Sequence, residues 1–121
     1  MIFKPETYHL TIFQGADLRE EFAFSDSNGS PVDLSGALFQ AQIRTDFAAI
    51  TASDLTVTVI DASAGVFAVT MPLSATTLLA NTIQSNSRDI PWGVWDLEAV
   101  IGGEKSRLLQ GNVVVSREVT K

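Results

Sequence analysis

The chain has 121 residues, of which 45% are hydrophobic and 18% are charged, and this balance excludes a disordered protein. It carries a formal net charge of −6, its basic residues are scattered along the sequence and it has no cysteine, which argues against nucleic-acid binding and excludes a disulfide framework and a thiolate metal site. Its first ten residues lack the apolar core of a secretory signal and no apolar run approaches the roughly 20 residues that span a bilayer, so we expect one domain over residues 1–121 with no membrane partner.

The first two predicted strands cover residues 8–13 and 18–24, where apolar and polar residues alternate. A period of two is typical of a strand with one face in a core. The inward faces would carry Tyr8, Leu10, Ile12, Leu18, Phe22 and Phe24.

Residues 25–36, SDSNGSPVDLSG, are rich in turn-forming residues and lead into a further alternating stretch at residues 37–44. Strands joined by so short a connection can pair only in the antiparallel sense. We therefore expect residues 25–36 to form a long hairpin-like connection. Residues 45–54 fit either an excursion at the sheet edge or a short turn of helix.

Two more strands are predicted at residues 55–60 and 66–71, separated by a turn. Residues 72–81 lack alternation, and Ser74 could cap a short helix near residues 74–81. The polar segment 82–91 is expected to be an exposed loop.

The last predicted hairpin joins residues 94–101 to residues 106–116 through the turn GGEK. Gly111 lies inside its second strand, where glycine often marks a bulge or a close backbone approach. About seven short strands without long intervening helices predict an all-β sandwich or small barrel.

No set of residues in the sequence predicts catalysis or metal binding. The single histidine, His9, lies on a predicted outer face, and the Asp26–Asn28–Gly29 turn lacks the further carboxylates of a calcium loop. Asp96 and Glu98 share one strand face about 7 Å apart, the expected pattern of a solvated face. We therefore expect a protein that is not an enzyme and that uses neither a cofactor nor a metal.

Large apolar residues on predicted outer faces are the first candidates for protein docking. These residues are Phe13, Ile60 and Trp92. Trp95 shares a face with Leu97 and belongs to the predicted core, whereas Trp92 follows Pro91 and is either a rim aromatic or an anchor for a protein or a sugar.

Three long segments of the sequence are informative when they are considered together and in order. They are FQGADLREEFAFSDSNGSPVDLSGALFQAQIR, GVFAVTMPLSATTLL and GVWDLEAVIGGEKSRLLQGNVVVSREVTK. This order resembles small immunoglobulin-like β-sandwich proteins from tail regions of tailed bacteriophages and prophages. It is similar to the N-terminal module of upper baseplate proteins.

The resemblance implies an immunoglobulin-like antiparallel β-sandwich of about seven or eight strands. It also implies a non-enzymatic virion component, a tail, baseplate or tail-fibre attachment adaptor that is assembled in the host cytoplasm. The partners would be other phage structural proteins, with a homo-oligomer as one arrangement. Since no further domain follows residues 117–121, we expect a stand-alone adaptor rather than a complete receptor binder. The alternatives are a capsid decoration protein and a carbohydrate-binding module with Trp92 as its stacking platform.

Overall fold

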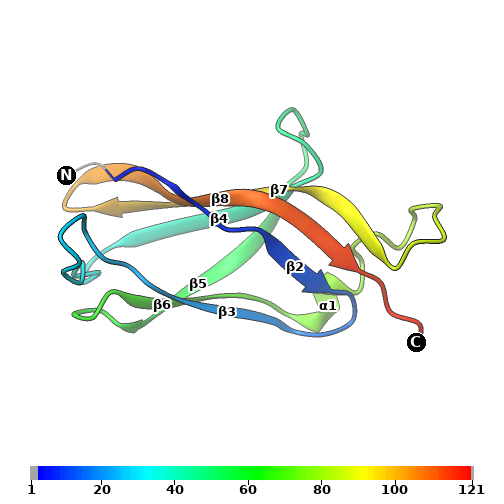
Figure 1. Ribbon diagram of the computed structural model, residues 1–121, viewed down its shortest axis with the longest axis horizontal. Helices are drawn as coiled ribbons and strands as arrows, with labels where there is room; N and C mark the ends of the chain where they lie inside the picture. The colour runs from blue at the N-terminus through cyan, green and yellow to red at the C-terminus, as the bar shows by residue number, and fades with distance from the viewer. Residues whose placement is uncertain (1–2, 121) are drawn as a thin grey trace.

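The structure is a computed structural model that describes residues 3–120. In this range the chain forms strands and one short helix (Figure 1). These elements are β1 (Glu6–Thr7), β2 (Leu10–Phe13), β3 (Leu18–Ala23), β4 (Leu38–Arg44), β5 (Ser53–Asp61), β6 (Val66–Met71), α1 (Leu73–Thr76), β7 (Asp89–Ile101) and β8 (Glu104–Ser116).

The eight strands form one curled sheet in the order β1-β8-β7-β4-β5-β6-β3, with β2 also paired to β8. Strand β5 joins the two halves of this sheet. Its start pairs with β4, at Leu55 opposite Ala41, and its remaining residues pair with β6. As a result, β8, β7 and β4 lie over β5, β6 and β3 in Figure 1. The predicted all-β fold is confirmed, whereas the immunoglobulin-like sandwich stays a prediction.

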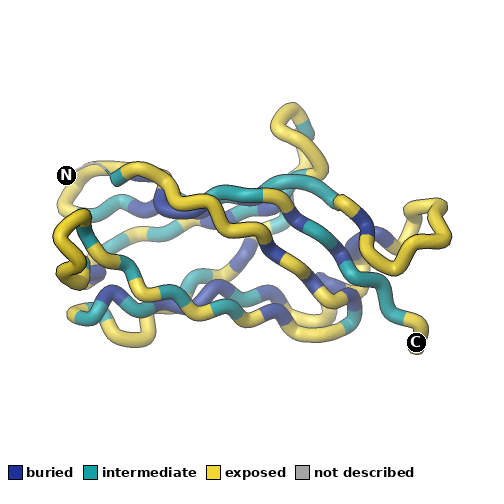
Figure 2. Tube along the Cα trace, viewed as in Figure 1, coloured by how far each residue is buried: buried dark blue, intermediate teal, exposed yellow. Residues whose placement is uncertain are grey.

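The core lies between the two halves of the curled sheet, and buried residues alternate with exposed ones along most strands (Figure 2). Strands β2, β6 and β7 bury the apolar residues that their alternation predicted. The largest fully buried side chains include Phe67, Leu10, Ile12, Leu34, Ile43, Met71, Leu97 and Leu108. The alternating pattern therefore identified the inner faces, as expected for a sheet with one face against a core.

The sheet is not wholly antiparallel, which corrects one prediction. Strands β1 and β2 run parallel to β8, with Leu10 opposite Val113. They form one edge of the sheet and β3 forms the other. The Tyr8 hydroxyl donates a hydrogen bond to Glu20 on β3 at 3.1 Å, and the Tyr8 and Phe22 rings meet edge to face at 5.0 Å. Side chains, rather than a backbone ladder, therefore close the gap between the two edges.

Residues 25–36 form the expected hairpin-like connection with antiparallel pairing at its tip, but the strands on either side of it do not pair with each other. The Asp26 carboxylate accepts backbone N–H bonds from Asn28 and Ser30, and a single bridge joins Ser25 to Pro31. Beyond this tip, β3 pairs with β6 while β4 pairs with β5 and β7. The segment therefore connects the two halves of the sheet.

The helix is shorter than predicted and begins earlier. It covers Leu73–Thr76, and Ser74 is its second residue rather than its N-cap. The Asp17 carboxylate, from the turn before β3, accepts the Leu73 N–H at 2.7 Å and satisfies one of the free donors at the helix N-terminus. The residues that follow form turns.

Strand β7 begins at Asp89, so the predicted exposed loop 82–91 ends sooner than expected. A register shift between Pro91 and Gly93 places Trp92 at a bulge. A bulge re-aims the side chain that it carries. Trp92 is consequently half-buried and packs against the core, and Trp95 is fully enclosed, 3% exposed.

Candidate binding surfaces

The structure separates the three predicted docking residues. Phe13 ends β2 and Ile60 lies near the end of β5, and both are exposed. Trp92 is half-buried on β7. No two of these strands are paired to each other, so none of the three side chains has another of the three as a cross-strand neighbour. Docking at any of them stays a prediction.

A buried glutamine organises one end of the molecule. Gln14, 7% exposed, donates to the Leu79 carbonyl at 2.7 Å and to the Thr77 carbonyl at 3.4 Å. Its side-chain oxygen accepts the Glu118 N–H at 3.1 Å. One amide therefore links the β2–β3 turn, the turn after α1 and the segment after β8.

Thr76 strengthens the same junction. Its buried hydroxyl donates to the Ala16 carbonyl at 2.8 Å and accepts the Gly15 N–H at 3.2 Å. Gly15 has a φ of +84°, and a side chain there would overlap the Glu118 carboxylate. Residues 14–17 (QGAD) and residues 73–76 (LSAT), which are far apart in the sequence, thus contact each other and stabilise this end of the fold.

Exposed apolar side chains surround this junction, which we call the Gln14 corner. Phe13 is adjacent to Gln14, Leu78 lies between the two residues whose carbonyls Gln14 contacts, and Val119 follows Glu118. The exposed apolar residues of the corner are Phe13, Leu73, Leu78, Ile83 and Val119, which range from 37% to 78% exposed. These side chains are attached to backbone segments that the hydrogen bonds of Gln14 and Thr76 hold together.

Arg117 holds the neighbouring loop, residues 82–88. Its guanidinium donates to the backbone carbonyls of Ile83, Ser85 and Ser87, and its backbone N–H donates to the Arg88 carbonyl at 2.8 Å. A hollow of about 380 Å³ lies between this loop and Gln14. The loop is therefore an ordered part of the same end of the molecule.

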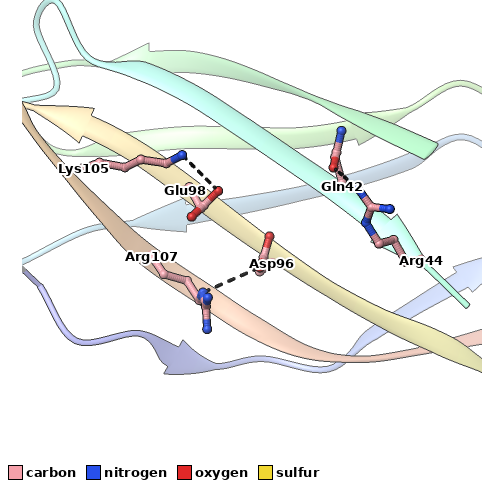
Figure 3. Close-up of polar contacts among 6 residues, drawn as sticks. All are labelled: Gln42, Arg44, Asp96, Glu98, Lys105 and Arg107. Atoms are coloured by element: carbon pink, nitrogen blue, oxygen red, sulfur yellow. Dashed lines mark hydrogen bonds and ion pairs between the residues drawn. The ribbon is translucent and has the colours of Figure 1, made fainter. Parts of the chain in front are cut away.

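A second candidate surface is the outer face of β4, β7 and β8 (Figure 3). On this face Glu98 lies 3.6 Å from Lys105, and Asp96 lies 3.6 Å from Arg107. Gln42 donates to Asp54 at 2.8 Å. The solvated face that the sequence predicted for Asp96 and Glu98 is thus a network of ion pairs and amides.

The carboxyl of Asp96 is the perturbed group of this network. Partial burial, and secondly the negative charge of Glu98, raise the pKa of Asp96 above its ordinary value, although Arg107, Arg44 and Lys105 oppose the shift. Burial disfavours the charged form of a carboxylic acid, and a like charge nearby does the same. Asp96 therefore keeps its proton more readily than a free aspartic acid does.

Loop 45–52 projects beyond this face at the end of β4 (Figure 1). The guanidinium of Arg44 donates to the carbonyls of Ala49 and Ile50, and the Asp46 carboxylate accepts the Ala48 N–H at 2.8 Å. Loop 45–52 contains a turn but no helix. Of the two alternatives left open for residues 45–54, the structure therefore favours an excursion of the chain.

The tip of this loop presents two large apolar side chains to solvent. Phe47 is 90% exposed and Ile50 is 97% exposed. Neither residue was selected from the sequence. Two large apolar residues inside a stretch without strand alternation were the available signal.

A groove of about 370 Å³ runs between Phe47 and the polar face. Its lining includes His9, Val94, Asp96, Arg107, Gln110 and Asn112. His9 is exposed, as predicted, and its Nδ1 accepts the Asn112 N–H at 3.0 Å. A neutral imidazole in that arrangement carries its proton on Nε2, where it is available as a donor.

Comparison with known proteins adds no relative. No protein-family model matches the chain, and no curated protein is similar to it in sequence. The surfaces of the structure therefore carry the functional argument.

Within residues 3–120, no three or more His, Asp and Glu side chains gather where they could hold a metal ion. In the same range, no helix has the length and hydropathy needed to cross a bilayer.

Proposed function

We propose that the chain is a non-enzymatic structural component of a phage virion, a tail, baseplate or tail-fibre attachment adaptor that docks through the Gln14 corner. The observation that carries this proposal is the group of exposed apolar side chains held on a hydrogen-bonded frame. Exposed apolar residues that gather in one region are typical of a protein interface.

The rigidity of the corner favours docking. Its backbone is fixed by Gln14, Thr76 and Asp17 before any partner arrives. Association then loses little conformational entropy of the backbone, and the burial of Phe13 and Leu78 contributes nearly in full. Large apolar anchors at the centre of an interface commonly account for most of its affinity.

The resemblance to phage tail proteins supplies the biological setting of the proposal. The segments that carry it include Gln14, Gly15, Asp17 and Thr76, which build the corner. The partners would be other phage structural proteins, with further copies of the chain as one arrangement, and the place of action would be the virion.

Mass spectrometry of particles produced from the natural phage or prophage genome tests the proposal. We expect the wild-type protein in purified particles, and we expect the exposed-site variants Phe13→Asp and Leu78→Asp to remain folded but to be lost from them. Leu38→Asp is the matched control, because Leu38 is an equally exposed leucine outside the corner. Absence of the wild-type protein from particles, or normal incorporation of both corner variants, would contradict the proposal.

Electron microscopy of the same particles separates the tail adaptor from the decoration protein. Extra density on the tail supports the adaptor, and density on the head lattice supports decoration of the capsid. The Gln14 corner is the docking surface in either case, so the corner variants have the same expected effect.

A further inference from the structure

We infer that the groove beneath loop 45–52 is a saccharide-binding site, in which the ring of Phe47 stacks on a sugar and polar side chains of β7 and β8 bind its hydroxyl groups. This inference goes beyond protein docking and does not depend on it, since the groove and the Gln14 corner are built from different residues.

The charges of the face favour a neutral polar ligand. The charged residues that line the groove are Asp96 and Arg107, whose formal charges cancel, although the chain as a whole carries −6. A balanced surface attracts neither a polyanion such as nucleic acid nor a polycation.

The hydrogen-bonding groups of the groove also match a sugar. Each sugar hydroxyl both donates and accepts, and the groove offers carboxylate acceptors beside guanidinium, imidazole and amide donors. The polar side chains of its lining include Asp96, Arg107, Gln110, Asn112 and His9. These are short or planar side chains, which a ring of hydroxyl groups can approach without large rearrangement.

Phe47 supplies the apolar half of the site. Its ring is 90% exposed, yet it lines the groove together with Val94. An exposed aromatic face packs well against the C–H face of a sugar ring. Trp92, the stacking residue suggested by the sequence, does not line this groove and instead packs on the core beside the other side of the loop.

The loop is held in place before a ligand arrives. Arg44 bonds two of its carbonyls, and Gly93 allows its base to lie against β7, because a side chain at Gly93 would overlap the Arg44 carbonyl. The groove of about 370 Å³ falls within the size range of small-molecule sites. A preformed site binds a flexible oligosaccharide at a smaller entropic cost.

A protein is a less suitable occupant of this groove. An apolar partner surface would desolvate the Asp96–Arg107 pair, which lies on an open face and gains little from being buried. A saccharide keeps this pair in contact with hydroxyl groups and water, so its solvation is largely retained.

The test is a printed array of neutral and acidic bacterial glycans, followed by NMR titration of the labelled protein with the strongest binder. We expect binding, with shifts confined to loop 45–52 and to the outer face of β7 and β8. Phe47→Ala is expected to weaken binding about fivefold to tenfold. Leu38→Ala, an exposed leucine beyond the groove, is the control and is expected to bind as wild type does.

Three outcomes would overturn the inference: no glycan bound by the wild-type protein at millimolar concentration, binding unchanged by Phe47→Ala, or shifts centred on another surface. Unfolding cannot imitate the expected result, because Phe47 has almost no contacts to lose and the thermal midpoint of the variant is measured alongside. Incorporation into particles is a separate readout, so failure of one proposal leaves the other standing.

Discussion

Replacement of Gln14 by leucine tests the reasoning about the corner most directly. Leucine is close to glutamine in size but makes no hydrogen bond, so the bonds to Leu79 and Thr77 and the bond from Glu118 are all removed. Gln14 is 7% exposed, so water replaces these bonds poorly. The Leu79 carbonyl then loses the shorter of the two hydrogen bonds that Gln14 donates, in a buried position.

The expected loss of stability follows from the number of bonds. A hydrogen bond between neutral groups contributes about 1 kcal/mol net, and an unsatisfied buried group costs about as much again or more. We therefore expect the free energy of unfolding to fall by ~3 kcal/mol. At about 2.1 cal/mol/K per residue, a chain of 121 residues has an unfolding entropy near 250 cal/mol/K, so the melting temperature should fall by about 12 °C.

The assay is calorimetry at pH 7 combined with urea unfolding, which separates a change in stability from a change in the denaturant slope. Gln84→Leu is the control, because Gln84 is an exposed glutamine in loop 82–88 and surface changes of this kind usually stay within ~0.5 kcal/mol. A Gln14→Leu variant that melts within about 3 °C of wild type would refute the role assigned to the corner.

Three other changes probe other parts of the fold. Gly111→Ala should destabilise the protein by about 2 kcal/mol in urea unfolding, because the added methyl group would overlap the Tyr8 carbonyl between β8 and the N-terminal edge. Arg117→Ala should speed amide hydrogen exchange and proteolysis within loop 82–88 with little change in global stability. Asp96→Asn should gain stability relative to wild type as the pH rises from about 3 to 7, because a folded-state pKa above the unfolded value means that ionisation of Asp96 opposes folding.

Matched controls accompany these changes. Gly29→Ala has open space around it and tests only the cost of a positive φ, about 1 kcal/mol, so an equal effect of Gly111→Ala would contradict the overlap argument. Arg88→Ala should leave exchange in loop 82–88 unchanged. Asp33→Asn should show the opposite pH trend from Asp96→Asn, because the Ser35 backbone N–H, and secondly its hydroxyl, lower the pKa of Asp33 and its ionisation supports folding.

The alternation of apolar residues was enough to predict the inner faces of the strands. Phe67, Val69 and Met71 were expected to be buried in β6, and they are. Burial on one face of a strand leaves a direct trace in the sequence, because each inward position must be apolar whatever the strand pairs with. The pairing itself leaves no such trace, which is why the parallel pairing of β1 and β2 with β8 was not predicted.

The surfaces were harder to predict for a related reason. A bulge at Trp92 shifts the side-chain phase of β7, and nothing in the local pattern announces it. Gln14 reads as an ordinary polar residue until its distant partners at residues 77–79 and 118 are known. Phe47 and Ile50 lie in a segment without a regular apolar period. Their exposure could therefore be seen only once the path of the loop was known.

The curled sheet has a spine at β5 and an opening where β1 and β2 face β3. Along the spine every step is a backbone ladder, whereas the opening is latched by the Tyr8–Glu20 hydrogen bond and by the ring pairs Tyr8–Phe22 and Phe3–Phe24. The two halves of the sheet are thus joined by backbone hydrogen bonds on one side and by side chains on the other. Under force or heat, the edge formed by β1 and β2 should separate from β3 before the backbone ladders break. A partner that bound both edges at once would stabilise the closed sheet.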